Sequence, residues 1–117
     1  MIMLYRSNKI YVDDSIIHGR GVFASSIIEK GEILEECHFI NVPSDMDYPL
    51  ILKEHFFTWP KGGNELIICL GYGSIFNHSD FDFNADWETD TNKKKLIFFA
   101  TRDIMKGEEI FTNYQRL

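Results

Sequence analysis

The spacing of glycine and proline is the feature that most constrains how this chain can fold. The 117 residues include 8 Gly and 3 Pro, and these residues interrupt the chain at short intervals. The stretches between them are rich in Ile, Phe, Val, Tyr and Thr. Such a pattern is typical of a mainly β domain with many short strands. We expect strands over residues 9–12, 21–24, 33–42, 65–70, 85–88, 96–100 and 109–112.

One stretch, residues 46–57, fits a short helix poorly but fits a strand worse. Ser44 or Asp45 could cap such a helix at its start. Pro49 confines any helix to the part that follows it, because proline lacks a backbone N–H and fixes φ.

Length and composition indicate one folded domain that spans residues 1–117. Hydrophobic residues make up 44% and charged residues 26% of the chain, the balance of a globular protein. The net charge of -6 argues against a general nucleic-acid binder, which needs a basic surface, and suits a basic partner. No segment approaches the roughly 20 apolar residues of a membrane span, and the apolar start is too short for a signal peptide.

The two cysteines, Cys37 and Cys69, are isolated in the sequence. They form no paired metal-binding motif, so we expect no zinc cluster. One disulfide is possible, but two buried free thiols in a reducing compartment are the favoured interpretation. We therefore expect a cytoplasmic or host-intracellular protein that is not secreted.

The sequence also contains one basic run and one internal repeat. Lys93, Lys94 and Lys95 are expected to form a solvated turn with Asp90 and Asn92. Residues 28–33 and 104–110 share the order apolar, any residue, Lys, Gly, Glu, then a strand. Glycine in that position supplies a positive φ for a tight turn. Two copies are too few for a solenoid.

Three clusters contain residue types suited to ligand binding: residues 18–23 with a Gly-x-Gly, residues 71–79 with an Asn-His pair, and residues 107–114 ending in a tyrosine. The Gly-x-Gly is no dinucleotide fingerprint, because a third glycine and a following helix are missing. The four histidines are not spaced as metal ligands, so we expect no metal site. Taken singly, each cluster is compatible with a turn, a buried histidine or a surface tyrosine.

The ordered set of the three clusters resembles the SET-domain protein lysine methyltransferases, in particular their minimal viral and bacterial type. The matching motifs are Gly-x-Gly-Val-Phe, Phe-Asn-His-Ser and Gly-Glu-Glu-Ile-x-x-x-Tyr, and the resemblance spans residues 10–114. It implies the β-clip fold of that family, with short curved sheets, one or two short helices, and a C-terminal segment threaded beneath a loop as a pseudoknot.

The resemblance also implies a cofactor, S-adenosylmethionine, and roles for particular residues. Gly19, Arg20 and Gly21 are expected to lie along the cofactor. Asn77 and His78 are expected to hydrogen-bond it, mainly through backbone groups.

The same resemblance places the substrate. Tyr114 is expected to be the catalytic residue, where the substrate lysine meets the methyl group. His55 and Tyr72 are expected to bind substrate beside it, His55 at the position of a channel tyrosine in relatives. Methyl transfer to an amine needs a deprotonated lysine and good alignment, which a phenol and backbone carbonyls can provide.

The expected partner is a lysine-containing basic protein or peptide, with no direct nucleic-acid or membrane contact. The acidic stretch Asp80, Asp82, Asp86, Glu88 and Asp90 has no balancing base in the sequence. It could attract a basic peptide, or equally be a solvated hairpin. In place of the proline and asparagine that usually follow Asn-His-Ser in the family, the loop has Asp80-Phe81-Asp82-Phe83-Asn84.

We expect no post-SET tail, because Tyr114 is three residues from the end of the sequence. A partner subunit or the substrate would then complete the channel, and a homodimer is a reasonable expectation. The leading hypothesis is an S-adenosylmethionine-dependent protein-lysine N-methyltransferase. The alternatives are a SET-like module that binds a peptide or partner with little turnover, and a β-clip domain with an unrelated ligand.

Overall fold

The computed structural model describes residues 4–114. Within this part the chain forms ten strands, the short helix α1 (Leu50–Lys53) and the 3-10 turn η1 (Gly71–Ser74). The mainly β prediction with one or two short helices is therefore confirmed. The strands are β1 (Ile10–Asp14), β2 (Arg20–Ala24), β3 (Ile33–Cys37), β4 (Phe39–Val42), β5 (Phe56–Trp59), β6 (Glu65–Cys69), β7 (Asn77–His78), β8 (Ala85–Asp90), β9 (Lys95–Ala100) and β10 (Glu109–Thr112).

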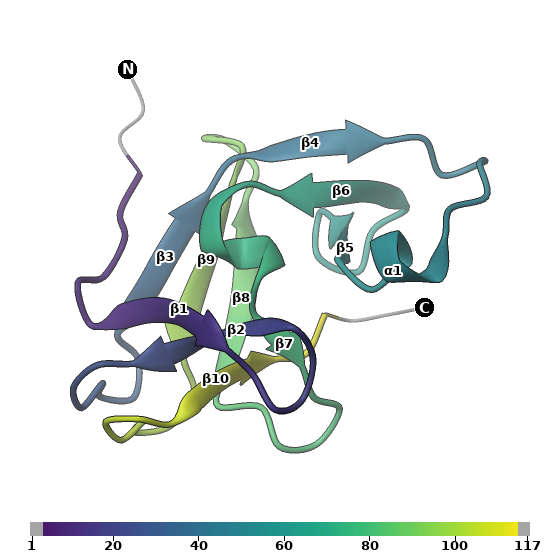
Figure 1. Ribbon diagram of the computed structural model, residues 1–117. Helices are drawn as coiled ribbons and strands as arrows, with labels where there is room; N and C mark the ends of the chain where they lie inside the picture. The colour runs from purple at the N-terminus through teal and green to yellow at the C-terminus, as the bar shows by residue number, and fades with distance from the viewer. Residues whose placement is uncertain (1–3, 115–117) are drawn as a thin grey trace.

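The strands form two sheets (Figure 1). The larger has the order β1-β2-β10-β8-β9-β3, with β7 attached to β10, and the smaller has the order β4-β6-β5. Figure 1 shows the small sheet and α1 extending to one side of the larger sheet. Both sheets are open, so the fold consists of short curved layers and not of a closed barrel.

Strand β10 has the topology that the predicted pseudoknot requires. It pairs antiparallel with β2 and parallel with both β7 and β8, through Phe111 opposite Asn77 and Thr112 opposite Ala85. The loop between β7 and β8 is bonded to β10 at both of its ends, because the backbone N–H of Ser79 donates to Thr112 and that of Asn84 donates to Phe111. The C-terminal strand thus lies between two segments that one loop connects.

The two repeated turns pair with each other. Ile28 and Ile104 exchange both backbone hydrogen bonds, each 2.8 Å long. Gly31 and Gly107 have φ values of +90° and +88°, which L side chains rarely adopt. The positive φ predicted for both glycines is confirmed.

Each of these turns is closed in the same way by its own glutamate. Glu32 accepts from the backbone N–H of Glu29 at 3.0 Å, and Glu108 accepts from that of Met105 at 2.9 Å. The sequence similarity therefore corresponds to one turn geometry used twice.

The core lies between the sheets and is rich in aromatic side chains. Trp87, Phe57, Phe76, Phe98 and Tyr114 are at most 1% exposed. Rings of this size bury large apolar areas, so a short chain can still form a substantial core.

Three details of the expected elements are wrong. The run 33–42 is two strands, because its first half pairs with β9 and its second half with β6 in the other sheet. Helix α1 begins after Pro49, as expected, but it is only four residues long and has no side-chain cap from Ser44 or Asp45. Phe56 and Phe57, the last two residues of the expected helical stretch, belong to β5, because the aromatic and β-branched side chains of this strand pack better on a pleated sheet than on a helix.

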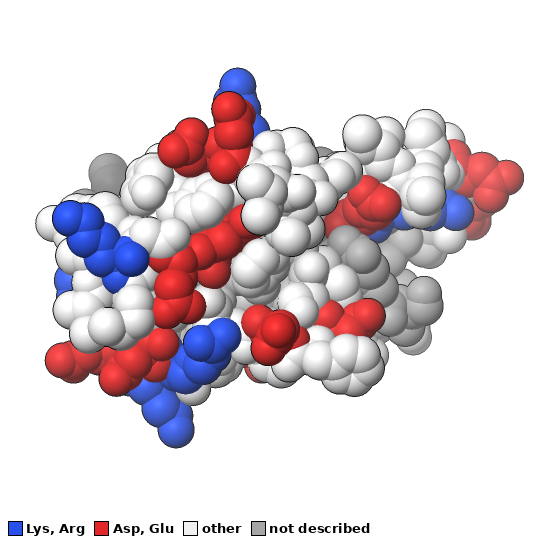
Figure 2. All heavy atoms as spheres, turned by 60° about the horizontal axis from the view of Figure 1, so that its bottom comes forward, with Lys and Arg blue, Asp and Glu red and all other residues white. Residues whose placement is uncertain are grey.

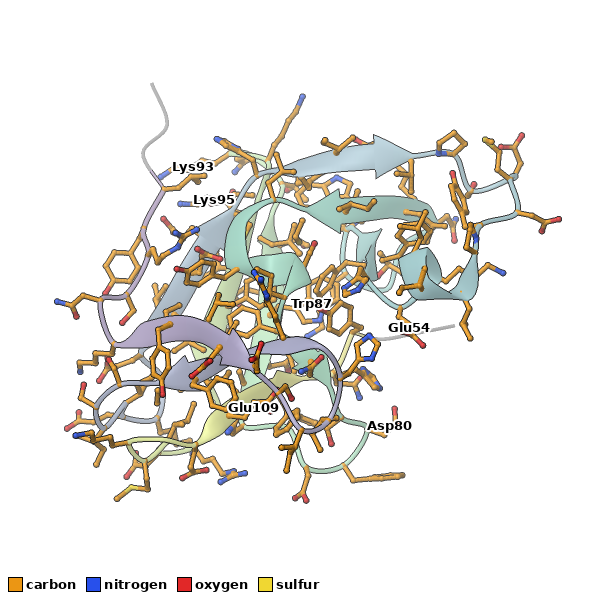
Figure 3. The ribbon with its side chains drawn as sticks, viewed as in Figure 1. Glu54, Asp80, Trp87, Lys93, Lys95 and Glu109 are labelled. Carbon is orange, nitrogen blue, oxygen red and sulfur yellow. The ribbon has the colours of Figure 1, made fainter. Side chains whose placement is uncertain are left out.

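Lys95 also departs from expectation. Lys93 and Lys94 are exposed in a turn, as predicted, and the backbone N–H of Lys93 donates to Asp90. Lys95 instead begins β9, is 7% exposed and donates to Glu36 at 2.7 Å. Figure 3 shows Lys93 and Lys95 at the same end of β9. A buried ammonium is tolerated there because a carboxylate pairs with it.

Both cysteines are free and buried, as expected. Burial raises the pKa of the Cys37 and Cys69 thiols well above the ordinary value, because the thiolate would lose its hydration. These thiols are therefore inert side chains of the core at neutral pH.

Candidate functional site

The Gly-x-Gly cluster lies at the end of the β1–β2 loop and the start of β2, and this loop lies against β7 (Figure 1). The backbone N–H of Ser15 donates to the carbonyl of Gly19 at 2.8 Å and closes the loop. Gly19 has φ +50°, and no atom lies within 4 Å of the place where a Cβ would project. Gly19 and Arg20 are exposed. The loop therefore presents open backbone and one guanidinium on its outer side.

Asn77 joins this loop to the C-terminal strand. Its side-chain amide donates to the carbonyl of Arg20 at 3.1 Å and to the carboxylate of Glu109 at 2.7 Å. The side chain of this residue is thus engaged inside the protein. What Asn77 can offer a ligand is therefore its backbone.

His78 connects the second cluster to the third. Its Nδ1 accepts from the backbone N–H of Tyr114 at 3.0 Å, so Nδ1 carries no proton and Nε2 does. The Nε2–H then donates to Asp80 at 2.6 Å. One ring nitrogen of His78 thereby holds the backbone of Tyr114, and the other is held by the carboxylate of Asp80, which Figure 3 labels.

Tyr114 projects into the protein and not into water. It is 1% exposed, and its hydroxyl donates to the carbonyl of Phe76, the residue before Asn77. The carbonyl of Gly73 lies 3.4 Å from the same hydroxyl. The phenol is therefore surrounded by backbone acceptors, which is a suitable setting for binding an amine.

The ring of Tyr114 is held by a stack of aromatic side chains. Phe57 lies parallel to it with ring centroids 4.1 Å apart, and the ring of His78 stands at 5.9 Å. Phe57 also contacts Trp87 edge-on at 5.0 Å. Figure 3 places Trp87 in the interior, between β8 and the small sheet. This packing limits the movement of the phenol.

Phe57 also lines a cavity of about 430 Å³. It is of the size that ligand pockets usually have. Its lining is mostly apolar, with a lysine and a glutamate among it: Ser44, Met46, Tyr48, Leu50, Lys53, Glu54, Phe56, Phe57, Thr58 and Leu66. Phe57 thus contacts both this cavity and the ring of Tyr114.

Of the two expected substrate residues, Tyr72 belongs to η1, and His55 contacts the last residue of that turn. The Nδ1 of His55 donates to the carbonyl of Ser74 at 2.7 Å, because a carbonyl can only accept. The ring of Tyr72 lies under the guanidinium of Arg6, 3.8 Å from its centroid. His55 therefore holds the end of the turn that carries Gly73, whereas Tyr72 faces the N-terminal segment.

The acidic stretch is less uniform than the sequence indicated. Asp86 does have a balancing base, because Lys61 donates to it at 2.8 Å. Asp80 accepts from His78, while Asp82 and Glu88 are exposed. Figure 2 shows acidic side chains across the middle of one face of the molecule and basic ones mostly toward its edges. Within the stretch itself, the pairing of Asp86 with Lys61 leaves only part of the negative charge available to a partner.

Two residues of the site, Asn84 and Glu109, were missed from the sequence. Asn84 is 1% exposed, and its side chain donates to the carbonyl of Glu109 and accepts from the N–H of Phe111. Glu109 accepts from Ser15 and Asn77. An asparagine after a loop and a glutamate inside a strand gave no reason to expect these long-range partners.

The expected cofactor can be tested against these residues. S-adenosylmethionine carries an amino-acid end with a carboxylate, and Arg20 offers an exposed guanidinium beside the open backbone of Gly19. The residues present therefore fit that group. In the part of the chain that the structure describes, no group of three or more His, Cys, Asp or Glu side chains could hold a metal ion.

No helix within residues 4–114 is long and apolar enough to cross a membrane.

Comparison with known proteins agrees with the motifs and the fold. The SET-domain family matches residues 19–115. A Plasmodium falciparum protein that is provisionally named histone-lysine N-methyltransferase 1 is 30% identical over an alignment of 117 positions, which covers 92% of this chain and 2% of that protein. The chain therefore spans only a small part of that relative.

Solved structures give the same result. A crystal structure of a Plasmodium falciparum protein, provisionally named a histone methyltransferase, has a TM-score of 0.74 and 32% identity, and covers 95% of this chain and 96% of the other. The methyltransferase domain of human PR domain-containing protein 2 has a TM-score of 0.70 over 93% of this chain and 78% of its own, but at 15% identity it shows the fold alone. With this fold, and with a family match over most of its length, the chain belongs to the SET-domain family of protein-lysine methyltransferases.

Proposed function

We propose that this protein transfers a methyl group from S-adenosylmethionine to the ε-amine of a lysine in a basic protein or peptide. The observation that carries the proposal is the convergence of three sequence clusters. The hydroxyl of Tyr114 donates to the residue before Asn77, His78 binds the backbone of Tyr114, and Asn77 binds the Gly-x-Gly loop. Residues distant in the sequence are joined by direct hydrogen bonds.

The chemistry assigned to each residue follows from its contacts. The cofactor, when bound, supplies an electrophilic methyl group on a sulfonium. Gly19 and Arg20 would hold it, together with the backbone of the Asn77–His78 strand. Tyr114 keeps acceptor capacity on its oxygen while donating its proton to Phe76, so it can accept an N–H of the amine. The carbonyl of Gly73 offers a second acceptor, and burial of the phenol favours a neutral lysine.

The substrate class is supported by charge. The net charge is -6, and the exposed side chains Asp82 and Glu88 are free to attract a basic segment by long-range electrostatics. Two relatives carry names that refer to histone methylation, and histones are basic. We therefore propose a lysine-rich protein, with histones as the first candidates to assay.

The test measures binding and transfer separately. Thermal melting with S-adenosylhomocysteine should raise the melting temperature, because a ligand that binds the folded state stabilises it. Labelled S-adenosylmethionine should then transfer its methyl group to histones or another basic protein. Tyr114→Phe should lose transfer while it retains the melting shift. Equal labelling by both proteins would reject the role of Tyr114, and a melting shift without any transfer would favour a binding module.

A further inference from the structure

The carboxylate of Glu109 occupies the centre of the contacts between the β1–β2 loop, β7 and β10. Figure 3 shows this side chain on β10, below the β1–β2 hairpin. One oxygen accepts from the hydroxyl of Ser15 at 2.7 Å, and the other accepts from the amide of Asn77 at 2.7 Å. In the described part of the chain no lysine or arginine forms an ion pair with it. Its partners are neutral donors on two different segments.

These donors are the ones that shape the loop. Ser15 begins the loop that closes through its N–H on Gly19, and Asn77 also donates to the carbonyl of Arg20. A single carboxylate therefore fixes both the entry of the loop and, through Asn77, its exit. Hydrogen bonds to a charged acceptor are stronger than neutral ones, which suits a group that holds a loop in one conformation.

Gly21 is the second glycine of the Gly-x-Gly, and its surroundings explain its identity. A Cβ at this position would lie 2.2 Å from Oε2 of Glu109, 2.9 Å from its Cδ and 3.1 Å from the Asn77 amide nitrogen. Its φ is not in the positive range that requires glycine, unlike that of Gly19. The missing Cβ therefore makes room for the carboxylate.

We propose that Glu109 is the positioning residue of the cofactor loop, and that Gly21 is a glycine in order to admit its carboxylate rather than a ligand. The proposal rests on the proposed function in one respect, namely that the β1–β2 loop binds S-adenosylmethionine. Glu109 acts through Ser15 and Asn77 and need not touch the reacting atoms. The conformation of a loop near the N-terminus is thus set by a side chain of the C-terminal strand.

A double-mutant cycle tests the pair. Gly21→Ala, Glu109→Ala and the double variant are compared by urea unfolding and by calorimetric binding of S-adenosylhomocysteine. In the Glu109→Ala background the added methyl meets no carboxylate, so Gly21→Ala should lose most of its effect on stability and binding. If the glycine admitted the cofactor instead, Gly21→Ala would weaken binding by the same factor in both backgrounds, and the proposal would be overturned.

A second set of variants changes only single polar groups and so adds no atoms to the packed region around Gly21. Ser15→Ala removes one hydrogen bond to Glu109. Ser7→Ala is its matched control, because each of the two hydroxyls accepts a hydrogen bond of 3.1 Å from the backbone N–H of the residue two positions later in the sequence. We expect Ser15→Ala to weaken S-adenosylhomocysteine binding several-fold and Ser7→Ala to leave it unchanged. Glu109→Gln should retain binding, since an amide can accept from Asn77 and donate to Ser15. Equal binding by Ser15→Ala and the wild type would overturn the proposal.

The two proposals fail in different ways. If the wild type does not bind S-adenosylhomocysteine, the proposed function fails, while the cycle in urea still measures the coupling of Gly21 and Glu109. If the wild type binds but the coupling is absent, only the positioning role fails. For the methyl-transfer reaction, Glu109→Ala should raise the KM for the cofactor roughly tenfold, about 1.4 kcal/mol, and change kcat much less.

Discussion

Replacement of Phe57 by leucine tests the aromatic stack that holds Tyr114. Phe57 is 1% exposed and contacts three rings, those of Tyr114 at 4.1 Å, Trp87 at 5.0 Å and Phe98 at 5.7 Å. Each aromatic pair contributes about 0.5–1.5 kcal/mol beyond its buried area. Leucine keeps much of the apolar area but makes none of these ring contacts. Phe57→Leu should therefore lower the free energy of unfolding by about 1.5–4.5 kcal/mol.

The adjacent Phe56 provides the matched control. It is 8% exposed and makes one edge contact, with Tyr48 at 5.0 Å. By the same reasoning Phe56→Leu should cost about 0.5–1.5 kcal/mol. Urea unfolding of the two variants, monitored by circular dichroism, measures the difference. Equal costs for the two substitutions would refute the claim that the stack around Phe57 is the stronger element.

The same pair of variants separates stability from activity. In Phe57→Leu the phenol of Tyr114 loses its parallel partner, so methyl transfer should fall even at temperatures where the variant stays folded. Phe56→Leu should retain more of the activity, since Phe56 packs on the ring of Tyr48. Full activity of folded Phe57→Leu would show that Tyr114 does not depend on this ring.

Three further predictions concern other parts of the fold. Gly73→Ala should lower the free energy of unfolding in urea by about 1–3 kcal/mol through overpacking, because its Cβ would lie 2.9 Å from the Sγ of Cys37. Adding Cys37→Ala should recover part of that loss, and no recovery would contradict this account. Gly31→Ala and Gly107→Ala should each lower the free energy of unfolding by about 1–2 kcal/mol, since both glycines have a positive φ and open surroundings. Clearly different losses for the two variants would contradict the equivalence of the two turns. The hydrogen bond from Lys95 lowers the pKa of Glu36 below its ordinary 4.5, so this carboxylate stabilises the fold above that pH, and its contribution is lost as the pH falls further. Between about pH 6 and pH 3.5, Glu36→Gln should therefore lose less free energy of unfolding than the wild type. An equal loss in the two proteins would contradict this role of Glu36.

Local sequence pattern predicted most of the strands for a simple physical reason. Short runs of β-branched and aromatic residues between glycines have few alternatives to a strand, and the run at 109–112 has the predicted bounds. The repeated Lys-Gly-Glu turns were predicted in the same way, since a positive φ at Gly31 and Gly107 is a local requirement. The division of residues 33–42 was not predictable, because a run contains no signal of where it changes partner.

For the site, the sequence by itself determined the inventory: two glycines in one loop, an Asn-His pair and a tyrosine after a strand. Only the tertiary structure decided what each side chain does there. It assigned the amide of Asn77 to the loop and to Glu109, turned the hydroxyl of Tyr114 toward Phe76, and placed Tyr72 under Arg6. These contacts join residues 32 to 66 positions apart in the sequence. The contact of Asn77 with Glu109 and that of Tyr114 with Phe76 form where β10 lies between β7 and β8. Local preferences carry no information about which distant groups a strand will meet.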